Sequence, residues 1–264
     1  MKGGYISRTV TTMIGIQLYT VRDLLVDKEG CERTIAALAE MGYECIQLAG
    51  GSASIETMKN SIEAAKKHGL KVVGILSNPT ALNESLNELC GIARDAGCYD
   101  IGISGVAKCE ESSKELVKVA NELAAAVRAK GFSFSYHNHS HEYLRTEYGK
   151  RVMDILLDGF DKDAIDLMPD TYWLQHGGVD VRDFIETHAD RIKILHLKDM
   201  KRIPDGVTFA EVGEGNLNMS GIIKTALKAG VRDFIVEQDK CDGDPLESAR
   251  ISCENLKRIF AEIK

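Results

Sequence analysis

Three of the seven histidines in the chain, His137, His139 and His141, lie within five positions of one another, and Glu142 follows them directly. Neutral imidazole nitrogens and carboxylate oxygens are ligands that divalent cations take from proteins. The same groups also move protons, since the ordinary pKa of histidine lies close to neutral pH. The segment is therefore a metal site, a proton-transfer site or only a polar loop.

Polar side chains also stand at the ends of apolar runs elsewhere in the chain, at Gln17, Gln47, Asp170, His196 and Glu237. Each has an ordinary explanation, because a histidine can be satisfied in a core, an aspartate can cap a helix and a carboxylate can be paired. The conjunction is more informative. A Glu or His from the 135–143 segment, with Asp170, His196 and Glu237, would form one site for a divalent cation, and one site is a simpler explanation than four accidents.

These residues need elements to position them, and the sequence alternates regularly between two patterns. Short runs with the composition of buried strands cover 13–19, 43–49, 70–76, 99–103, 132–137, 164–168, 192–197 and 234–237. Segments with helical periodicity lie between them, including 31–42, 55–69, 82–97 and 112–131, and several end in glycine just before the next run. The pattern predicts eight strand–helix units.

Eight such units predict an α/β fold, a closed (β/α)8 TIM barrel that forms a single domain over 1–264. The units share no sequence signature, which disfavours a solenoid. An open doubly wound sheet is the alternative, but it usually carries GxGxxG after the first strand, where this chain reads TVRDLL. In a TIM barrel the chemistry lies at the carboxyl ends of the strands, which is where the polar groups stand.

The composition narrows the class of partner. Apolar residues make up 44% of the chain and charged residues 28%, with a formal net charge of -7. This balance argues against nucleic-acid binding, which depends on clustered Lys and Arg, and no apolar run is long enough for a membrane span. The N-terminus lacks the apolar segment of a secretory signal, and the seven cysteines include no CxxC pair. We expect a cytoplasmic protein without a disulfide framework or zinc ribbon.

Five motifs resemble those of the sugar phosphate isomerase/epimerase superfamily, whose members have the xylose isomerase-like TIM barrel. They are YHNHSHEY, DTYW, HLKDM, EVGEG and IVEQD, and they occur in the family's order and spacing. The resemblance extends over essentially the whole chain, from about residue 13 to residue 260. It is specific to the superfamily and not to a substrate.

Members of that superfamily typically hold one divalent metal ion with a Glu, an Asp, a His and a Glu from strands five to eight. The resemblance implies Asp170, His196 and Glu237 as three of the ligands. The first ligand departs from the pattern, because His137 aligns where many members have Glu. We expect Glu142 to be the fourth ligand, with His137 and His139 as the alternatives.

The resemblance implies an isomerase or epimerase for a sugar, keto-sugar or inositol-derived substrate. A metal ion (Mn, Zn, Co or Mg) would stabilise the enediolate as a Lewis acid while protein groups move the proton. The expected catalytic residues are Glu142, Glu237, His137, His139 and Lys198. The expected substrate-binding residues are Gln17, Gln47, which replaces a Glu of related chains, and Trp173. We also expect the glycines of EVGEG to let a loop turn closely over the site.

Three rival functions remain. Metal and base would also permit dehydration of a keto-inositol or cleavage of a 3-keto-glycoside, and a barrel that had lost turnover would be a carbohydrate-binding protein. An endonuclease for abasic DNA is disfavoured, since Trp173 stands where such enzymes have a His and the chain is acidic. The expected partner is a small carbohydrate, with no nucleic acid and no membrane, and a homo-oligomer is an expectation from analogy.

Overall fold

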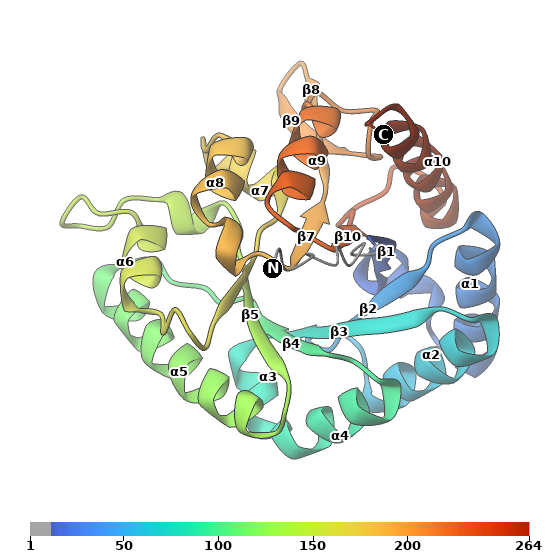
Figure 1. The fold of residues 1–264 in the computed structure, drawn as a ribbon, viewed down its shortest axis with the longest axis horizontal. Helices are drawn as coiled ribbons and strands as arrows, with labels where there is room; N and C mark the ends of the chain where they lie inside the picture. Colours follow the sequence, from blue (N-terminus) through green and yellow to red (C-terminus); the bar gives the residue numbers. More distant parts are fainter. Residues whose placement is uncertain (1–11, 264) are drawn as a thin grey trace, which may run out of the picture.

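Eight parallel strands surround a central axis, and helices surround the strands (Figure 1). The computed structural model describes residues 12–263, so residues 1–11 and 264 of the expected domain lie outside the described part. The strands are β1 (Met13–Gln17), β2 (Cys45–Ala49), β3 (Lys71–Ser77), β4 (Asp100–Ile103), β5 (Ser133–His137), β6 (Asp166–Met168), β7 (Ile194–Leu197) and β10 (Asp233–Val236). Each overlaps one of the eight predicted runs, which confirms the predicted (β/α)8 barrel.

The barrel closes between β6 and β7. Hydrogen-bonded strands follow the order β6-β5-β4-β3-β2-β1-β10-β7, so these two strands are the ends of the sheet. Two parallel bridges connect them, Leu167 with Ile192 and Asp170 with His196. The backbone N–H of His196 also donates to the carbonyl of Pro169 at 2.9 Å. The seam of the nearly closed barrel thus brings two predicted site residues together.

The period of two residues in a strand explains why polar groups end up inside the barrel. A small apolar cluster in the interior contains Cys45, Val73, Met168, Ile194 and Ile235. Two residues further along the same strands come Gln47, Asp170, His196 and Glu237. They share the inward face with that cluster and lie at the carboxyl end of the barrel.

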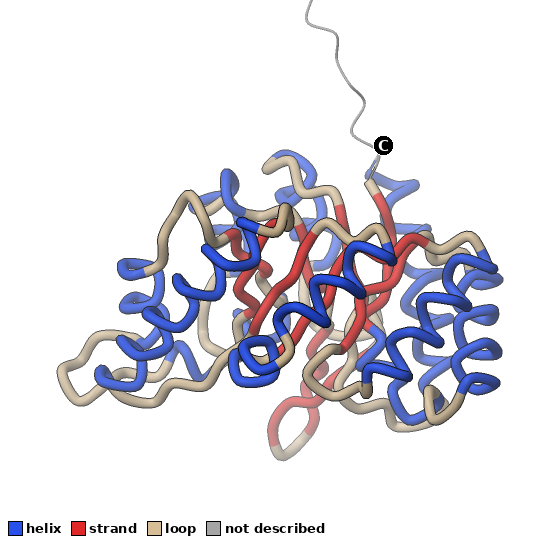
Figure 2. Tube along the Cα trace, turned by 90° about the horizontal axis from the view of Figure 1, so that it is seen from below, coloured by secondary structure: helices blue, strands red, loops and turns tan. Residues whose placement is uncertain are grey.

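Ten α-helices of the described residues cover the outside of the strands (Figure 2). They are α1 (Lys28–Met41), α2 (Ile55–His68), α3 (Pro79–Glu84), α4 (Leu86–Ala96), α5 (Glu110–Ala129), α6 (Val152–Gly159), α7 (Thr171–His176), α8 (Val181–Thr187), α9 (Met219–Lys228) and α10 (Pro245–Ile263). Between residues 12 and 263, no helix combines the length and the apolar character needed to cross a bilayer.

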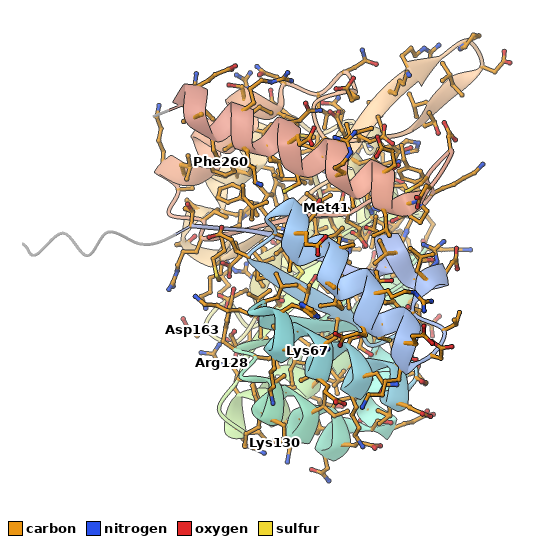
Figure 3. All side chains as sticks on the ribbon, turned by 90° about the vertical axis from the view of Figure 1, so that its right-hand side faces the viewer. Met41, Lys67, Arg128, Lys130, Asp163 and Phe260 are labelled. Atoms are coloured by element: carbon orange, nitrogen blue, oxygen red, sulfur yellow. The ribbon has the colours of Figure 1, made fainter. Side chains whose placement is uncertain are left out.

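The last helix, α10, packs beside the first, α1, as Figure 3 shows around Met41. The carbonyl of Met41, at the end of α1, accepts hydrogen bonds from Lys257 Nζ at 2.6 Å and Cys253 Sγ at 3.4 Å, both on α10. Gly42 then ends α1 with φ = 94°, a left-handed conformation that suits glycine.

The sequence did not predict several short elements, most of them at the carboxyl end of the barrel. They are the 3-10 helices η1 (Leu18–Leu24), η2 (His141–Tyr143) and η3 (Ala189–Arg191), helix α7, and the antiparallel hairpin of β8 (Asp199–Ile203) and β9 (Gly206–Ala210). The segment 82–97, predicted as one helix, is broken at Ser85 between α3 and α4. Pieces of three to seven residues are too short to establish a clear hydrophobic period.

Candidate metal centre

Four buried side chains meet at the carboxyl end of the barrel: His137 at the end of β5, Asp170 after β6, His196 in β7 and Glu237 after β10. One potential ligand atom of each lies within 4.8 Å of those of the others. The structure thus brings together the three ligands expected from strands six to eight. It adds His137 from strand five.

The side chain of His196 is held from both ends. Its Nε2 lies 2.7 Å from Gln47 Oε1, and its Nδ1 lies 2.8 Å from Glu237 Oε2. An N–H at Nε2 that donates to Gln47 leaves the lone pair of Nδ1 facing the carboxylate. Such a pair of acceptors is favourable when a cation lies between them, and the bond to Gln47 is the type of support that fixes a histidine ligand.

His137 has no hydrogen-bond partner at either ring nitrogen, although it is only 2% exposed. Its Nε2 lies 3.5 Å from Asp170 Oδ2 and 3.7 Å from Glu237 Oε2, and Asp170 Oδ2 also lacks a hydrogen bond of good geometry. Buried polar atoms without partners are costly. The residues present therefore fit a divalent cation, which their mixed nitrogen and oxygen donors would hold.

Lys198 lies fully buried beside this group. Its Nζ is 3.0 Å from Asp170, 3.1 Å from Glu237 and 2.8 Å from Asp239. Burial would lower the pKa of Lys198, but the three carboxylates outweigh burial and raise it. Burial would likewise raise the pKa of Glu237, yet Lys198 and His196 hold it well below its usual range. The ammonium and the carboxylate are both charged.

Glu142 does not join the four-residue group, contrary to the expectation that it is the first metal ligand. Its Oε1 accepts a hydrogen bond from the hydroxyl of Tyr136 at 3.0 Å, and its Oε2 accepts one from the backbone N–H of His139 at 2.9 Å. Burial raises its pKa to about 7, and these hydrogen bonds oppose the rise. With both oxygens engaged, Glu142 holds the turn after β5 while His137 faces the other ligands. Glu142 lies instead with His139 and His141 in a second, smaller cluster.

His139 and Trp173 lie next to each other above the four-residue group. Their ring centroids are 5.4 Å apart, and Lys198 Nζ lies 5.3 Å from the centroid of the Trp173 ring. Burial, His137 and Lys198 together lower the pKa of His139 to about 3, so its imidazole is neutral. His141 stacks on the outer side of His139 and lies 3.1 Å from the carbonyl of Gly105.

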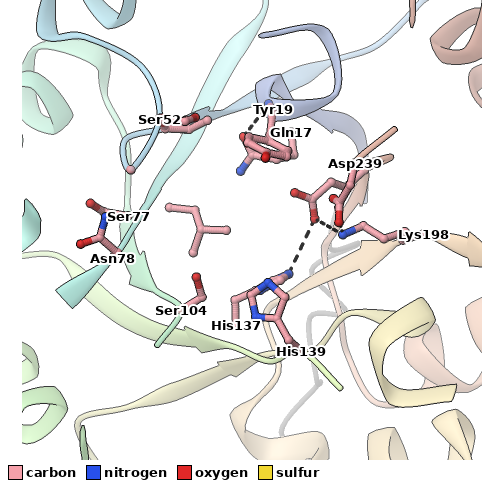
Figure 4. A pocket seen from close by; sticks show the side chains of 14 residues that line it. Gln17, Tyr19, Ser52, Ser77, Asn78, Ser104, His137, His139, Lys198 and Asp239 are labelled. Carbon is pink, nitrogen blue, oxygen red and sulfur yellow. Dashed lines mark hydrogen bonds and ion pairs between the residues drawn. The ribbon is translucent and has the colours of Figure 1, made fainter. Parts of the chain in front are cut away.

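A cavity of about 350 Å³ opens over these residues (Figure 4). Of the predicted site residues, those that line it are Gln17, His137, His139, Lys198 and Glu237. Gln47 and Trp173 are not among the lining residues. Gln47 lies behind His196 and accepts a hydrogen bond from Gln17 Nε2 at 2.7 Å, so its place in the structure is that of a support for His196.

Several lining residues were not predicted. Asp239 pairs with Lys198, and Ser77, Asn78 and Ser104 form the wall from β3 and β4. A search of the carboxyl ends of the third and fourth strands, and of the second residue beyond Glu237, would have found them, because barrel chemistry lies at these ends.

The EVGEG loop, expected over the site, wraps a different residue. The backbone N–H groups of Gly213 and Gly215 donate to Asp199 Oδ2 at 2.9 and 3.2 Å, and the N–H of Leu217 donates to Asp199 Oδ1 at 3.2 Å. A Cβ at Gly215 would lie 2.2 Å from Asp199 Oδ1, which explains the glycine. No residue of the loop lines the cavity, so its glycines serve the fold.

The sequence model of the xylose isomerase-like TIM barrel matches residues 35–259. The chain belongs to this family. The match confirms the resemblance drawn from the five motifs. Within the family, an inosose dehydratase from Clostridium perfringens is 27% identical over 158 residues, which cover 53% of this chain and 52% of that protein. The chain thus spans about half the length of the curated relatives it matches.

Solved structures of similar fold cover nearly the whole chain. A sugar phosphate isomerase/epimerase from Parabacteroides distasonis superposes with a TM-score of 0.79 at 21% identity, over 94% of this chain and 98% of that one. A xylose isomerase-like TIM barrel protein from Mycobacterium smegmatis, in complex with magnesium, superposes with a TM-score of 0.68 at 15% identity, over 98% and 99%. At these identities the likeness establishes the fold.

Proposed function

We propose that this protein is a divalent-metal-dependent enzyme that removes a proton next to the carbonyl of a polyhydroxylated ketone, and that the reaction is elimination of water. The observation that carries the proposal is His137, buried and unpartnered among Asp170, His196 and Glu237 at the floor of the cavity. A divalent ion held by these four residues would act as a Lewis acid toward the substrate carbonyl.

Elimination is favoured because the cavity presents one group that can take a proton and a different group that can give one. His139 offers an imidazole and Lys198 an ammonium group, and both line the cavity. In the proposed step, His139 takes the proton from the carbon beside the carbonyl, the C–H electron pair forms the carbon–carbon double bond, and the neighbouring C–O bond breaks. Lys198 gives a proton to the departing hydroxyl, which leaves as water.

The relatives support the same choice in part, since the matched Clostridium perfringens protein is an inosose dehydratase. Isomerisation or epimerisation is the second candidate, because the fold is shared with a sugar phosphate isomerase/epimerase. A mechanism with two carboxylates that flank the substrate is less favoured here, since Glu142 is engaged by Tyr136 and by the backbone of His139.

The test is mass spectrometry of products in deuterated water. Metal-loaded protein is incubated with a panel of keto-inositols and ketohexoses. Loss of one water from the product mass supports dehydration, whereas an unchanged skeleton with incorporated deuterium supports isomerisation or epimerisation. Absence of both, across the panel, would overturn the proposal.

Two variants assign the proton-transfer groups. His139→Gln and Lys198→Met are expected to lower kcat by roughly 10²- to 10⁴-fold, the usual range for a positioned acid or base, while the metal content is unchanged. His141→Gln is the matched control, because His141 stacks on His139 but does not line the cavity. An equal loss in the control would assign the effect to packing.

A further inference from the structure

The charges around the cavity are informative about the substrate. We propose that the substrate is an uncharged polyhydroxylated ketone, with neither a phosphate nor a carboxylate group. This inference rests on the proposed function for the location of the substrate. It concerns recognition and not the bond that breaks, so the two can fail separately.

Among the described lining residues, Lys198 is the one Lys or Arg side chain. It is not available to an anionic substituent, because three carboxylates already surround its Nζ at 2.8 to 3.1 Å. Arg22 does not line the cavity but a neighbouring hollow, and its guanidinium is held against Tyr19. Its Nη1 donates to the carbonyl of Tyr19 at 2.7 Å, and its guanidinium lies 4.0 Å from the centroid of the Tyr19 ring.

The formal charges at the floor of the cavity also exclude a surplus of positive charge. Asp170, Glu237 and Asp239 are negative and Lys198 is positive, which leaves two negative charges when the histidines are neutral ligands. A divalent ion would neutralise them. The floor would therefore carry no surplus positive charge for an anionic substituent.

The opposite wall offers hydrogen bonds instead of charge. Figure 4 shows Ser77, Asn78 and Ser104 across the cavity from Lys198 and Asp239. Ser77 lines the cavity, and its hydroxyl is buried without a hydrogen-bond partner. Asn78 Oδ1 caps α3 by accepting from the N–H of Ala81 at 2.9 Å, which leaves Nδ2 as a donor. Hydroxyl and amide groups of this kind match the hydroxyls of a polyol.

The space beyond this wall does not supply a cation either. A hollow of about 580 Å³ between α3 and α5 shares Asn78 and Ser104 with the cavity. The charged residues that line it are Glu84 and Glu115. A phosphate on a substituent that extended into this hollow would face carboxylates. Both the site and its extension favour a neutral ligand.

Calorimetry and saturation-transfer NMR with matched ligands test the inference. The probes are a ketohexose, its phosphate monoester, a keto-inositol and a cyclic keto acid, each with metal-loaded and metal-free protein. We expect the neutral ligands to bind about tenfold or more tightly than the anionic ones, since the cavity offers hydrogen bonds to hydroxyl groups and no free Lys or Arg to an anion. Equal or tighter binding of the phosphate ester or keto acid, in either form of the protein, would overturn the inference.

An added cation gives a second test that does not depend on catalysis. Glu115→Lys on α5 is expected to narrow the preference for the neutral ketohexose over its phosphate by several-fold. Glu122→Lys, two turns further along α5 and outside the hollow, is the control with the same change of charge. An unchanged ratio in Glu115→Lys would contradict the role of the hollow. Failure of the proposed function would instead appear as absence of deuterium exchange with every probe, whatever the order of affinity.

Discussion

The two ends of the barrel both contain buried charge, but they satisfy it differently. At the amino end, Asp100 accepts hydrogen bonds from Ser133 and Ser135, at 2.9 and 2.6 Å, and Asp166 pairs with Lys193. At the carboxyl end, four residues further along β5 and beyond β6, His137 has no hydrogen-bond partner, and Asp170 Oδ2 has only the ammonium of Lys198, which two other carboxylates share. In β4, β5 and β6 the polar residues at the amino end are therefore paired, whereas the polar layer at the carboxyl end is incomplete.

This difference separates structural polarity from a binding site. Burial alone does not, since Asp100 and Asp170 are both at most 2% exposed. The distinguishing features are ligand atoms from four strand ends that lie within 4.8 Å of one another, and a cavity that reaches them. The same distinction holds within the carboxyl end. Glu142 and Asp199 are as buried as the ligands, but their oxygens accept hydrogen bonds.

The largest expected effect comes from the incomplete layer. Asp170→Ala and His196→Ala should each remove stoichiometric metal, measured by elemental analysis of the purified protein. Activity should fall by roughly 10³-fold or more, because Lewis-acid stabilisation contributes several kcal/mol. Asp166→Ala, two strand positions below the apolar layer, should keep its metal. Retention of metal by both of the first two variants would refute the site.

The next effect separates His137 from Glu142. His137→Gln should weaken metal binding by at least about tenfold, while Glu142→Gln should change it by less than about threefold, since Glu142 acts on the turn after β5 and not on the ion. Competition with a chelating dye measures both affinities. A larger loss in Glu142→Gln would restore Glu142 as the ligand and imply that its carboxylate turns toward the ion.

A third variant tests whether Asp199 is structural. Its carboxylate accepts four backbone N–H groups, from Met200, Gly213, Gly215 and Leu217. Asp199→Asn should lower the free energy of unfolding by about 2–3 kcal/mol, because one carbonyl replaces two charged acceptors. Urea unfolding followed by Trp173 fluorescence measures it, and Asp205→Asn at the exposed hairpin turn is the control. Loss of metal in Asp199→Asn, without loss of stability, would contradict this assignment.

The sequence was a good guide to the barrel because short buried apolar runs alternate with helical segments long enough to show a period, and because the carboxyl ends of the strands lie at one end of the barrel. It located Asp170, His196 and Glu237 for the same reason. It favoured Glu142 over His137, whereas the structure groups His137 with the other three, because a 3-10 turn, η2, brings Glu142 under Tyr136. It also missed Asp239, whose place in the site shows through its ion pair with Lys198.

The smallest expected effect concerns the amino end, where a substitution is expected to raise the free energy of unfolding instead of lowering it. Burial raises the pKa of Asp100 to about 7, against hydrogen bonds from Ser135 and Ser133 that lower it. The folded protein therefore keeps a proton that the unfolded chain releases near its ordinary pKa of about 4. The stabilising contribution of Asp100 is present in full below about pH 4 and is lost as the pH rises to about 7.

Asp100→Asn removes this pH dependence, because the amide stays neutral and can still accept one of the serine hydroxyls. The variant should be more stable than the parent above pH 7, by about 1–3 kcal/mol, with little difference near pH 4. Thermal unfolding across pH 4–8 measures the difference, and Asp163→Asn on the surface is the control. A parent more stable than Asp100→Asn at pH 8 would mean that the Asp100 carboxylate is favourable when charged. The amino end would then resemble the carboxyl end in holding its charge ionised.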